Sequence, residues 1–197
     1  PLWSRGLGDV YKRQGGPFLY DIQDDPSLGD EGFEIITQPV GLDTHRQYWL
    51  KADLKGLRGH DVGGCGMHIH FTRRAVADVG GKQPALGRMA KFIYADENRT
   101  FMETVARRTF RDYAQRVPGM SVARGARRDH WNRHDALSMS RSNTVEFRLP
   151  RSTTKATTVI ATVEFVFLLL RFCEQASNAQ LNVVEFKKFV ADPRWAK

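Results

Sequence analysis

The chain has 197 residues, of which 41% are hydrophobic, so it is long enough to bury a core and too apolar to be disordered throughout. Its net charge of +8 keeps anionic partners, including nucleic acid, among the candidates. The longest apolar run, residues 158–170, contains Glu164 and is too short for a membrane span, and the N-terminus shows no apolar secretory signal.

Residues 1–14 resemble translated sequencing-adapter read-through, as found at the ends of metagenomic gene models. We expect them to be non-native, and a disordered basic tail is the alternative. Residues 15–197 are expected to form a single domain.

Two strands are predicted next, at residues 17–22 and 33–39, with an acidic turn between them. The second strand alternates with period two, so that Glu34 points away from its apolar neighbours. Pro39 ends this strand, because proline lacks the N–H that a central strand needs.

A helix is predicted over residues 42–57. Either Asp43 or Thr44 is expected to be its side-chain N-cap, and Leu50 belongs to its apolar stripe. Gly56 and Gly59 are expected to end the helix.

The rest of the chain shows strands and helices without regular alternation of the two. The predicted elements are a strand at 67–71, a pair of helices over 84–110 that is broken near 96–98, a strand at 136–139 that pairs with one at 144–149, a buried helix over 157–175 and a short amphipathic helix over 183–190 packed on the outside. Residues 117–133 are irregular and basic. This order predicts an α+β fold with a mostly antiparallel sheet.

His68 and His70 form the most informative short motif of the chain. In a strand their imidazoles share one face, while Met67, Ile69 and Phe71 share the other. Two such histidines can bind a metal or an anionic ligand, but an isolated His-x-His motif is equally typical of solvated surface histidines.

Glu146 and Arg148 lie on the polar face of a second alternating strand, and Glu34 lies on that of a third. Taken alone, Glu146 and Arg148 are typical of a cross-strand ion pair on a wet sheet face. Together with the histidines they indicate a ligand site. Carboxylate and imidazole suit a divalent cation, and an adjacent arginine suits a phosphate.

Five parts of the chain, in this order, resemble the amidoligase family of the glutamine synthetase-like carboxylate–amine ligase superfamily. They are residues 25–27, residues 32–39, residues 65–70, residues 98–101 with 106–108, and residues 144–150. The Gly-Met-His-x-His and Glu-x-Arg elements are the most specific of them. The resemblance implies a glutamine synthetase catalytic-domain-like fold, in which helices pack on one face of a curved, mostly antiparallel sheet. It also implies ATP-dependent joining of a carboxylate to an amine through an acyl phosphate.

Carried over by position, the resemblance makes Glu34, His68 and Glu146 the ligands of Mg²⁺ or Mn²⁺. The family usually has a further Glu-x-Glu motif on an early strand, and the aspartates within residues 21–25 do not match it. We therefore expect a truncated gene model, with a domain that is incomplete at its N-terminus, binds metal weakly and turns over poorly.

The resemblance also assigns the residues that face ATP and the substrates. Arg148 would contact the transferred phosphoryl group, and His70 would face the nucleotide or the substrate. Arg108 and Arg133 would lie near phosphate or near the substrate carboxylate. We expect Arg148, His70 and Arg133 to be catalytic, and Arg148, His70 and Arg108 to bind the nucleotide.

The sequence does not specify the carboxylate or the amine, and an amino acid, a peptide, a protein side chain or a polyamine all fit. Cys65 and Cys173 match no metal or redox spacing, so reduced thiols in a cytoplasmic protein are expected, with no membrane partner.

Three alternatives to the ligase remain open. One is a basic nucleic-acid-binding protein that uses residues 116–133 and Trp131, although nucleic acid is not the expected partner. Another is a metal-dependent nuclease that uses His130 and His134. The third is an inactive family member that serves as a binding or structural protein.

Overall fold

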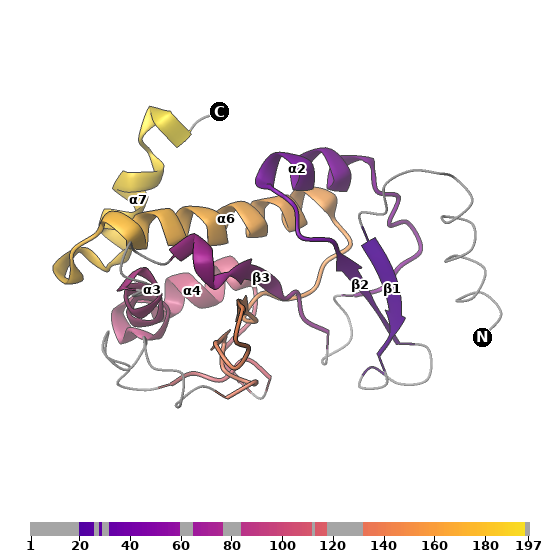
Figure 1. Cartoon of the computed structure of the whole chain (residues 1–197), viewed down its shortest axis with the longest axis horizontal. Coiled ribbons are helices and arrows are strands. Elements are labelled where there is room, and N and C mark those ends of the chain that lie inside the picture. Colours follow the sequence, from indigo (N-terminus) through magenta and orange to yellow (C-terminus); the bar gives the residue numbers. More distant parts are fainter. Residues whose placement is uncertain are drawn as a thin grey trace. The chain divides into compact units, whose positions relative to one another are not determined.

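The computed structural model describes most of the chain after residue 19 (Figure 1). The described residues are 20–25, 28, 32–59, 65–76, 84–111, 113–117 and 132–195. The adapter-like segment and most of the basic stretch 117–133 lie outside them. Helices and antiparallel strands both occur, which confirms the α+β prediction.

The chain divides into two compact units. The first contains residues 1–65 and 153–160, and the second contains residues 66–152 and 161–197. The long helix α6 (Ala156–Gln175) begins in the first unit and continues in the second.

In the first unit, β1 (Tyr20–Asp24) pairs antiparallel with β2 (Phe33–Thr37), as the alternating pattern predicts. Glu34 and Ile36 are exposed on one face of β2, while the alternate residues are half-buried. The two strands form a sheet of their own, so β2 is not paired with the strands that carry His70 and Glu146.

The helix predicted over residues 42–57 is shorter in the structure, where α2 covers Leu42–Lys51. Its N-cap is Gly41, without a side-chain cap, and Asp43 instead pairs with Arg46 one turn further on. The predicted stripe was also out of phase, because Leu50 is 66% exposed whereas Trp49 is buried. The chain after α2 is extended at first and then turns through Gly56, whose φ of +82° glycine adopts readily.

In the second unit, three short antiparallel strands form a sheet in the order β3 (Ile69–Thr72), β5 (Thr144–Phe147) and β4 (Leu137–Ser138). The predicted pairing of β4 with β5 is confirmed. The buried guanidinium of Arg73 holds the turn between them, since it donates to the carbonyl oxygens of Met139 and Arg141.

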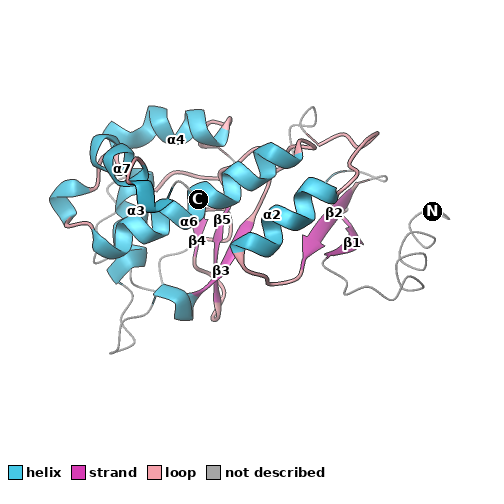
Figure 2. Ribbon diagram, turned by 90° about the horizontal axis from the view of Figure 1, so that it is seen from above, coloured by secondary structure: helices cyan, strands magenta, loops and turns pink. Residues whose placement is uncertain are grey.

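Four helices contribute to the core of the second unit: α3 (Pro84–Tyr94), α4 (Arg99–Ala106), α6 and α7 (Val183–Val190) (Figure 2). The predicted break between α3 and α4 occurs at Asp96–Asn98. Buried Asn98 stabilises this break by donating to the backbone carbonyls of Phe92 and Leu181.

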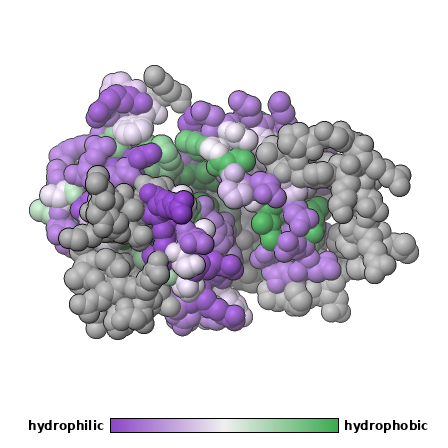
Figure 3. Space-filling model, viewed as in Figure 1, coloured by the Kyte–Doolittle hydropathy of each residue, from purple (hydrophilic) through white to green (hydrophobic). Residues whose placement is uncertain are grey.

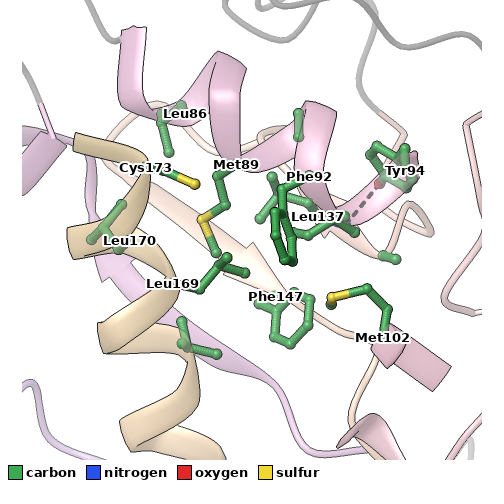
Figure 4. Packing of buried hydrophobic residues seen from close by; sticks show 14 of the residues in the cluster. Leu86, Met89, Phe92, Tyr94, Met102, Leu137, Phe147, Leu169, Leu170 and Cys173 are labelled. Carbon is green, nitrogen blue, oxygen red and sulfur yellow. Dashed lines mark hydrogen bonds between the residues drawn. The ribbon is translucent and has the colours of Figure 1, made fainter. Parts of the chain in front are cut away.

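The apolar face of the sheet packs against side chains of α3, α4 and α6 (Figure 4). Phe147 of β5 contacts the ring of Phe165 in α6, and the backbone N–H of Leu137 donates to the Tyr94 hydroxyl at 2.9 Å. Burial raises the pKa of that phenol, so it remains a neutral acceptor. The predicted outer helix α7 also reaches this core, because Phe186 packs among four other phenylalanine rings.

The helix α6 has 20 residues and is therefore longer than its apolar run suggests. By length and composition alone it could cross a membrane, which is a property that the core helix of a soluble protein shares. Val166, Leu169 and Phe172 are buried in the core, as a core helix requires.

Candidate functional site

Glu146 lies on the central strand of the three-stranded sheet. His70 of β3 stands directly opposite it on one side, and Ser138 of β4 does so on the other. Because directly opposed residues share a face, these three side chains form a row across the sheet. Val145 and Phe147 point to the other face and are buried in the core. The alternation that fills the core thus also fixes the direction of the Glu146 carboxylate.

Three nitrogen-bearing side chains meet one oxygen of this carboxylate. Nη1 of Arg148 lies 2.5 Å from Oε1 of Glu146, Nδ1 of His68 lies 3.1 Å from it, and Nε2 of His70 lies 3.7 Å from it. The Glu146 side chain is only 10% exposed. Among the described residues, no hydrogen-bond donor reaches its other oxygen, Oε2.

The pairing of β3 and β5 is irregular in the stretch that contains His68 and Arg148. Ile69 pairs with Phe147, whereas the next bridge joins Gly66 to Arg151. Two residues of the first strand therefore face three of the second, which is the count of a β-bulge. The N–H of Met67 donates to the Pro150 carbonyl within this stretch. Bulges of this kind turn side chains toward sites at the ends of sheets.

Arg148 is held from its other side by backbone atoms. Its Nε donates to the Tyr113 carbonyl at 3.2 Å, and its own N–H donates to the Ala136 carbonyl. Residues 113–117 lie along residues 132–136 through hydrogen bonds on both sides of Gln115. The guanidinium therefore bridges a carboxylate and a fixed carbonyl.

Arg108 reaches the same place from the end of α4. Arg107 ends that helix with a φ of +55°, which turns the next N–H back onto the Glu103 carbonyl. The side chain of Arg108 then reaches Gly66. A Cβ atom added at Gly66 would lie 3.0 Å from Nη1 of Arg108 and 3.2 Å from Nε2 of His68. Glycine at position 66 therefore allows both side chains to approach the backbone.

The charges around Glu146 oppose the effect of its burial. Burial alone would raise the pKa of this carboxyl, but the hydrogen bond from His68 and the charges of Arg148 and both imidazoles outweigh it, so the pKa is lowered. The pKa of His70 is lowered as well, first by burial and then by nearby positive charge, including Arg141, against the opposing pull of Glu146. A charged carboxylate beside a neutral His70 imidazole is the expected state at neutral pH.

The other predicted site residues are distributed differently. Glu34 is exposed on β2 of the first unit. Arg133 is exposed and donates from Nε to the ring of His134. The structure thus brings Arg148, His68 and His70 to Glu146, and it places Arg108 beside His68.

Only some of the residues that the nucleic-acid-binding and nuclease alternatives use are described. His130 and Trp131 lie outside the described residues. Arg116 donates to the Tyr94 carbonyl and to Asp96, so its guanidinium has a structural role.

Glu146 and His68 can be tested as ligands for Mg²⁺ or Mn²⁺. Adjacent ligand atoms on an octahedral Mg²⁺ are about 3 Å apart, since each lies about 2.0–2.1 Å from the ion. The separation of 3.1 Å between Nδ1 and Oε1 matches that value. The described residues contain no cluster of three or more His, Cys, Asp or Glu side chains arranged to hold a metal. Glu146 and His68 would therefore supply two protein ligands, and Mg²⁺ usually keeps several water ligands and is bound by few protein groups.

Sequence reasoning missed three contributors to this site. Ser138 could have been found, because it alternates with the buried Leu137 in a strand that was predicted to pair with β5. The carbonyl of Tyr113 carries no side-chain signal. The influence of Arg141 on His70 depends on the turn between β4 and β5.

The arrangement is a mostly buried carboxylate in contact with two imidazoles and one guanidinium group, with the guanidinium of Arg108 beside His68. Carboxylate and imidazole are donor types that suit a divalent cation, and guanidinium groups suit an anion. Both donor types lie at one end of a sheet whose opposite face is core. Comparisons of the chain with protein-family models, with curated proteins and with solved structures found no match.

Proposed function

We propose that this protein is an ATP-dependent carboxylate–amine ligase with a glutamine synthetase catalytic-domain-like fold. The observation that supports it is the convergence of Arg148, His68 and His70 on the carboxylate of Glu146. The donor types and their order in the chain are those that the resemblance to amidoligases implies. ATP with Mg²⁺ or Mn²⁺ is the proposed cofactor, a carboxylate and an amine are the substrates, and the cytoplasm is the proposed location. The buried thiol of Cys173 is in agreement with that location.

The chemistry explains why such a site needs charge rather than a nucleophile. A carboxylate oxygen attacks the γ-phosphorus of ATP and ADP leaves, which converts a poor leaving group into phosphate. The amine then attacks the acyl carbon, loses a proton and expels phosphate to form the amide. Phosphoryl transfer of this kind depends mainly on positioning and on neutralising negative charge.

Each residue of the site has a proposed part in this sequence. In this proposal Glu146 and His68 hold the metal, while Glu34, the third ligand that the resemblance implies, belongs to the first unit. When bound, the metal neutralises charge on the phosphates. Arg148 binds the transferred phosphoryl group, and His70 faces the nucleotide or the substrate.

The proposed contacts to the remaining anionic groups come from two further arginines. Arg108 and Arg133 would orient phosphate or the substrate carboxylate. Arg108 already lies beside His68 over Gly66.

The first experiment offers hydroxylamine as a general amine to the protein with ATP, Mg²⁺ and a panel of amino acids, short peptides and other carboxylates. Carboxylate-dependent release of ADP with formation of a hydroxamate is expected. Arg148→Ala should lower kcat by about 100-fold or more, as loss of a group that stabilises transition-state charge does.

Arg171→Ala is the matched control, because Arg171 pairs with Glu174 on α6 and has no proposed part in the reaction. Its kcat should stay within about twofold of the original value. Activity of Arg148→Ala equal to that of this control would reject the proposed site. Absence of ATP binding and of ADP release in the unmodified protein would reject the ligase proposal itself.

A further inference from the structure

The ion pair between Glu146 and Arg148 occupies both groups that the proposed ligands require. Nη1 of Arg148 is 2.5 Å from Oε1 of Glu146, and the two side chains are only 15% and 10% exposed. At this distance each charge is neutralised by the other, in surroundings where water screens them little.

A divalent cation placed between Oε1 of Glu146 and Nδ1 of His68 competes with Arg148 for the same carboxylate oxygen. Such an ion would lie about 2 Å from Oε1, on the side from which Nδ1 of His68 approaches. The positive guanidinium, already in contact with the same oxygen, would repel it. An anion that approaches Nη1 of Arg148 is repelled in turn by the negative carboxylate of Glu146, which already contacts that atom.

Arg148 has a second anchor that would survive opening of the pair. Its Nε donates to the Tyr113 carbonyl at 3.2 Å, and its backbone N–H donates to Ala136. When Nη1 releases Oε1, the guanidinium therefore stays at the site and can turn about its Nε edge. Among the described residues its Nη2 makes no hydrogen bond, which leaves a further donor for an anion.

We infer that the Glu146–Arg148 ion pair is a latch that a divalent cation and a phosphate group open together, so that each ligand strengthens binding of the other. This inference rests on the proposed function. A cation alone takes Glu146 and leaves Arg148 as a poorly solvated, uncompensated charge. A phosphate alone leaves Glu146 in the same state. When both bind, each displaced group gains a new partner, and the coupling must be reciprocal by thermodynamic linkage.

The test measures the Kd of Mn²⁺ for the 197-residue chain by the electron paramagnetic resonance signal of the free ion, with and without inorganic phosphate. Phosphate should tighten Mn²⁺ binding to the unmodified protein on the order of tenfold, after correction for the Mn²⁺–phosphate complex. This comparison needs no variant and no catalytic activity.

The variants give the result that distinguishes a latch from a simple binding site. Arg148→Gln should tighten Mn²⁺ binding without phosphate, because the competing cation is gone, and it should remove the effect of phosphate. Arg171→Gln, which removes a more exposed Arg–Glu pair on α6, should change neither quantity. Glu146→Gln should weaken Mn²⁺ binding under both conditions.

Two results would overturn the inference, and they differ in what else they overturn. If Mn²⁺ binds but phosphate does not change its Kd, or if Arg148→Gln weakens Mn²⁺ binding, the latch is wrong while the proposed metal site stands. If Mn²⁺ binds to neither the unmodified protein nor Arg148→Gln, both the latch and the proposed metal site are wrong.

Discussion

Glu146 shows how one residue can depend on almost every level of the structure. Its direction comes from strand alternation, its cross-strand partner His70 from the register with β3, and its tightest contact from Arg148, two residues further along the same segment. Its lowered pKa results from these contacts, because burial alone would act in the opposite direction.

At the residue scale, the change Glu146→Gln should lower the free energy of unfolding at pH 7 by about 2 kcal/mol, because it leaves Arg148 without its counter-ion. A carboxyl with a lowered folded-state pKa contributes stability above its ordinary pKa and loses it as the pH falls through the folded-state value. The difference between the two proteins should therefore shrink below about pH 4. Urea unfolding at pH 7 and at pH 3 to 4 measures this difference.

Glu185→Gln is the control for that experiment, since Glu185 forms an ion pair with Lys188 on the more exposed surface of α7. Its effect should stay within about 0.5 kcal/mol at both pH values. A stability difference for Glu146→Gln that is constant with pH would show that the lowered pKa is not what stabilises the fold.

At the scale of elements, α7 illustrates how a short helix joins a core through one side chain. Asn182 caps it by accepting the N–H of Glu185, and Phe186 is its only buried residue. The ring of Phe186 lies 5.5 to 5.9 Å from four other phenylalanine rings, which belong to α3, α4 and α6. Such edge-on contacts add to the free energy of apolar burial.

Phe186→Ala should therefore lower the free energy of unfolding by about 3–5 kcal/mol. Val184→Ala, on the same helix but at a residue that is 63% exposed, should change it by less than about 0.5 kcal/mol. Chemical denaturation of the two variants in parallel makes the comparison. Equal effects would mean that α7 packs through its other face.

At the scale of the whole molecule, the buried apolar residues are unevenly divided between the two units. Of the buried hydrophobic residues that the structure describes, only Trp49 and Val159 belong to the first unit. The surface of the described residues is mainly hydrophilic in the view of Figure 3, with smaller hydrophobic areas. The second unit therefore holds nearly all of the described core.

Hydrogen exchange should reflect this division. The amides of β1 and β2 are expected to exchange faster than those of β5 and of residues 161–175 in α6, because little buried apolar surface opposes local opening of the first unit. Mass spectrometry of peptic fragments after exchange gives the two rates. Equal protection in both units would show that they unfold as one cooperative body.

Much of the fold could be predicted because the signals for it are local. The break at Asp96–Asn98, the β4–β5 pairing and the bounds of α7 all follow from periodicity and turn residues within a short window. The glycine at position 56 predicts a longer helix from residue 42 than the structure has, because Ala52 is already extended. Nothing local marks that earlier stop.

The sequence by itself determined which face of each strand carries polar groups, and so it identified His70, Glu146 and Arg148 as neighbours of a core. Only the tertiary structure decided that His70 stands opposite Glu146 and that a backbone carbonyl anchors Arg148. It also decided that the side chains of Arg108 and His68 both lie close to Gly66. The physical reason is that alternation is a property of one strand, whereas register, bulges and carbonyl partners arise from pairing between segments far apart in the chain.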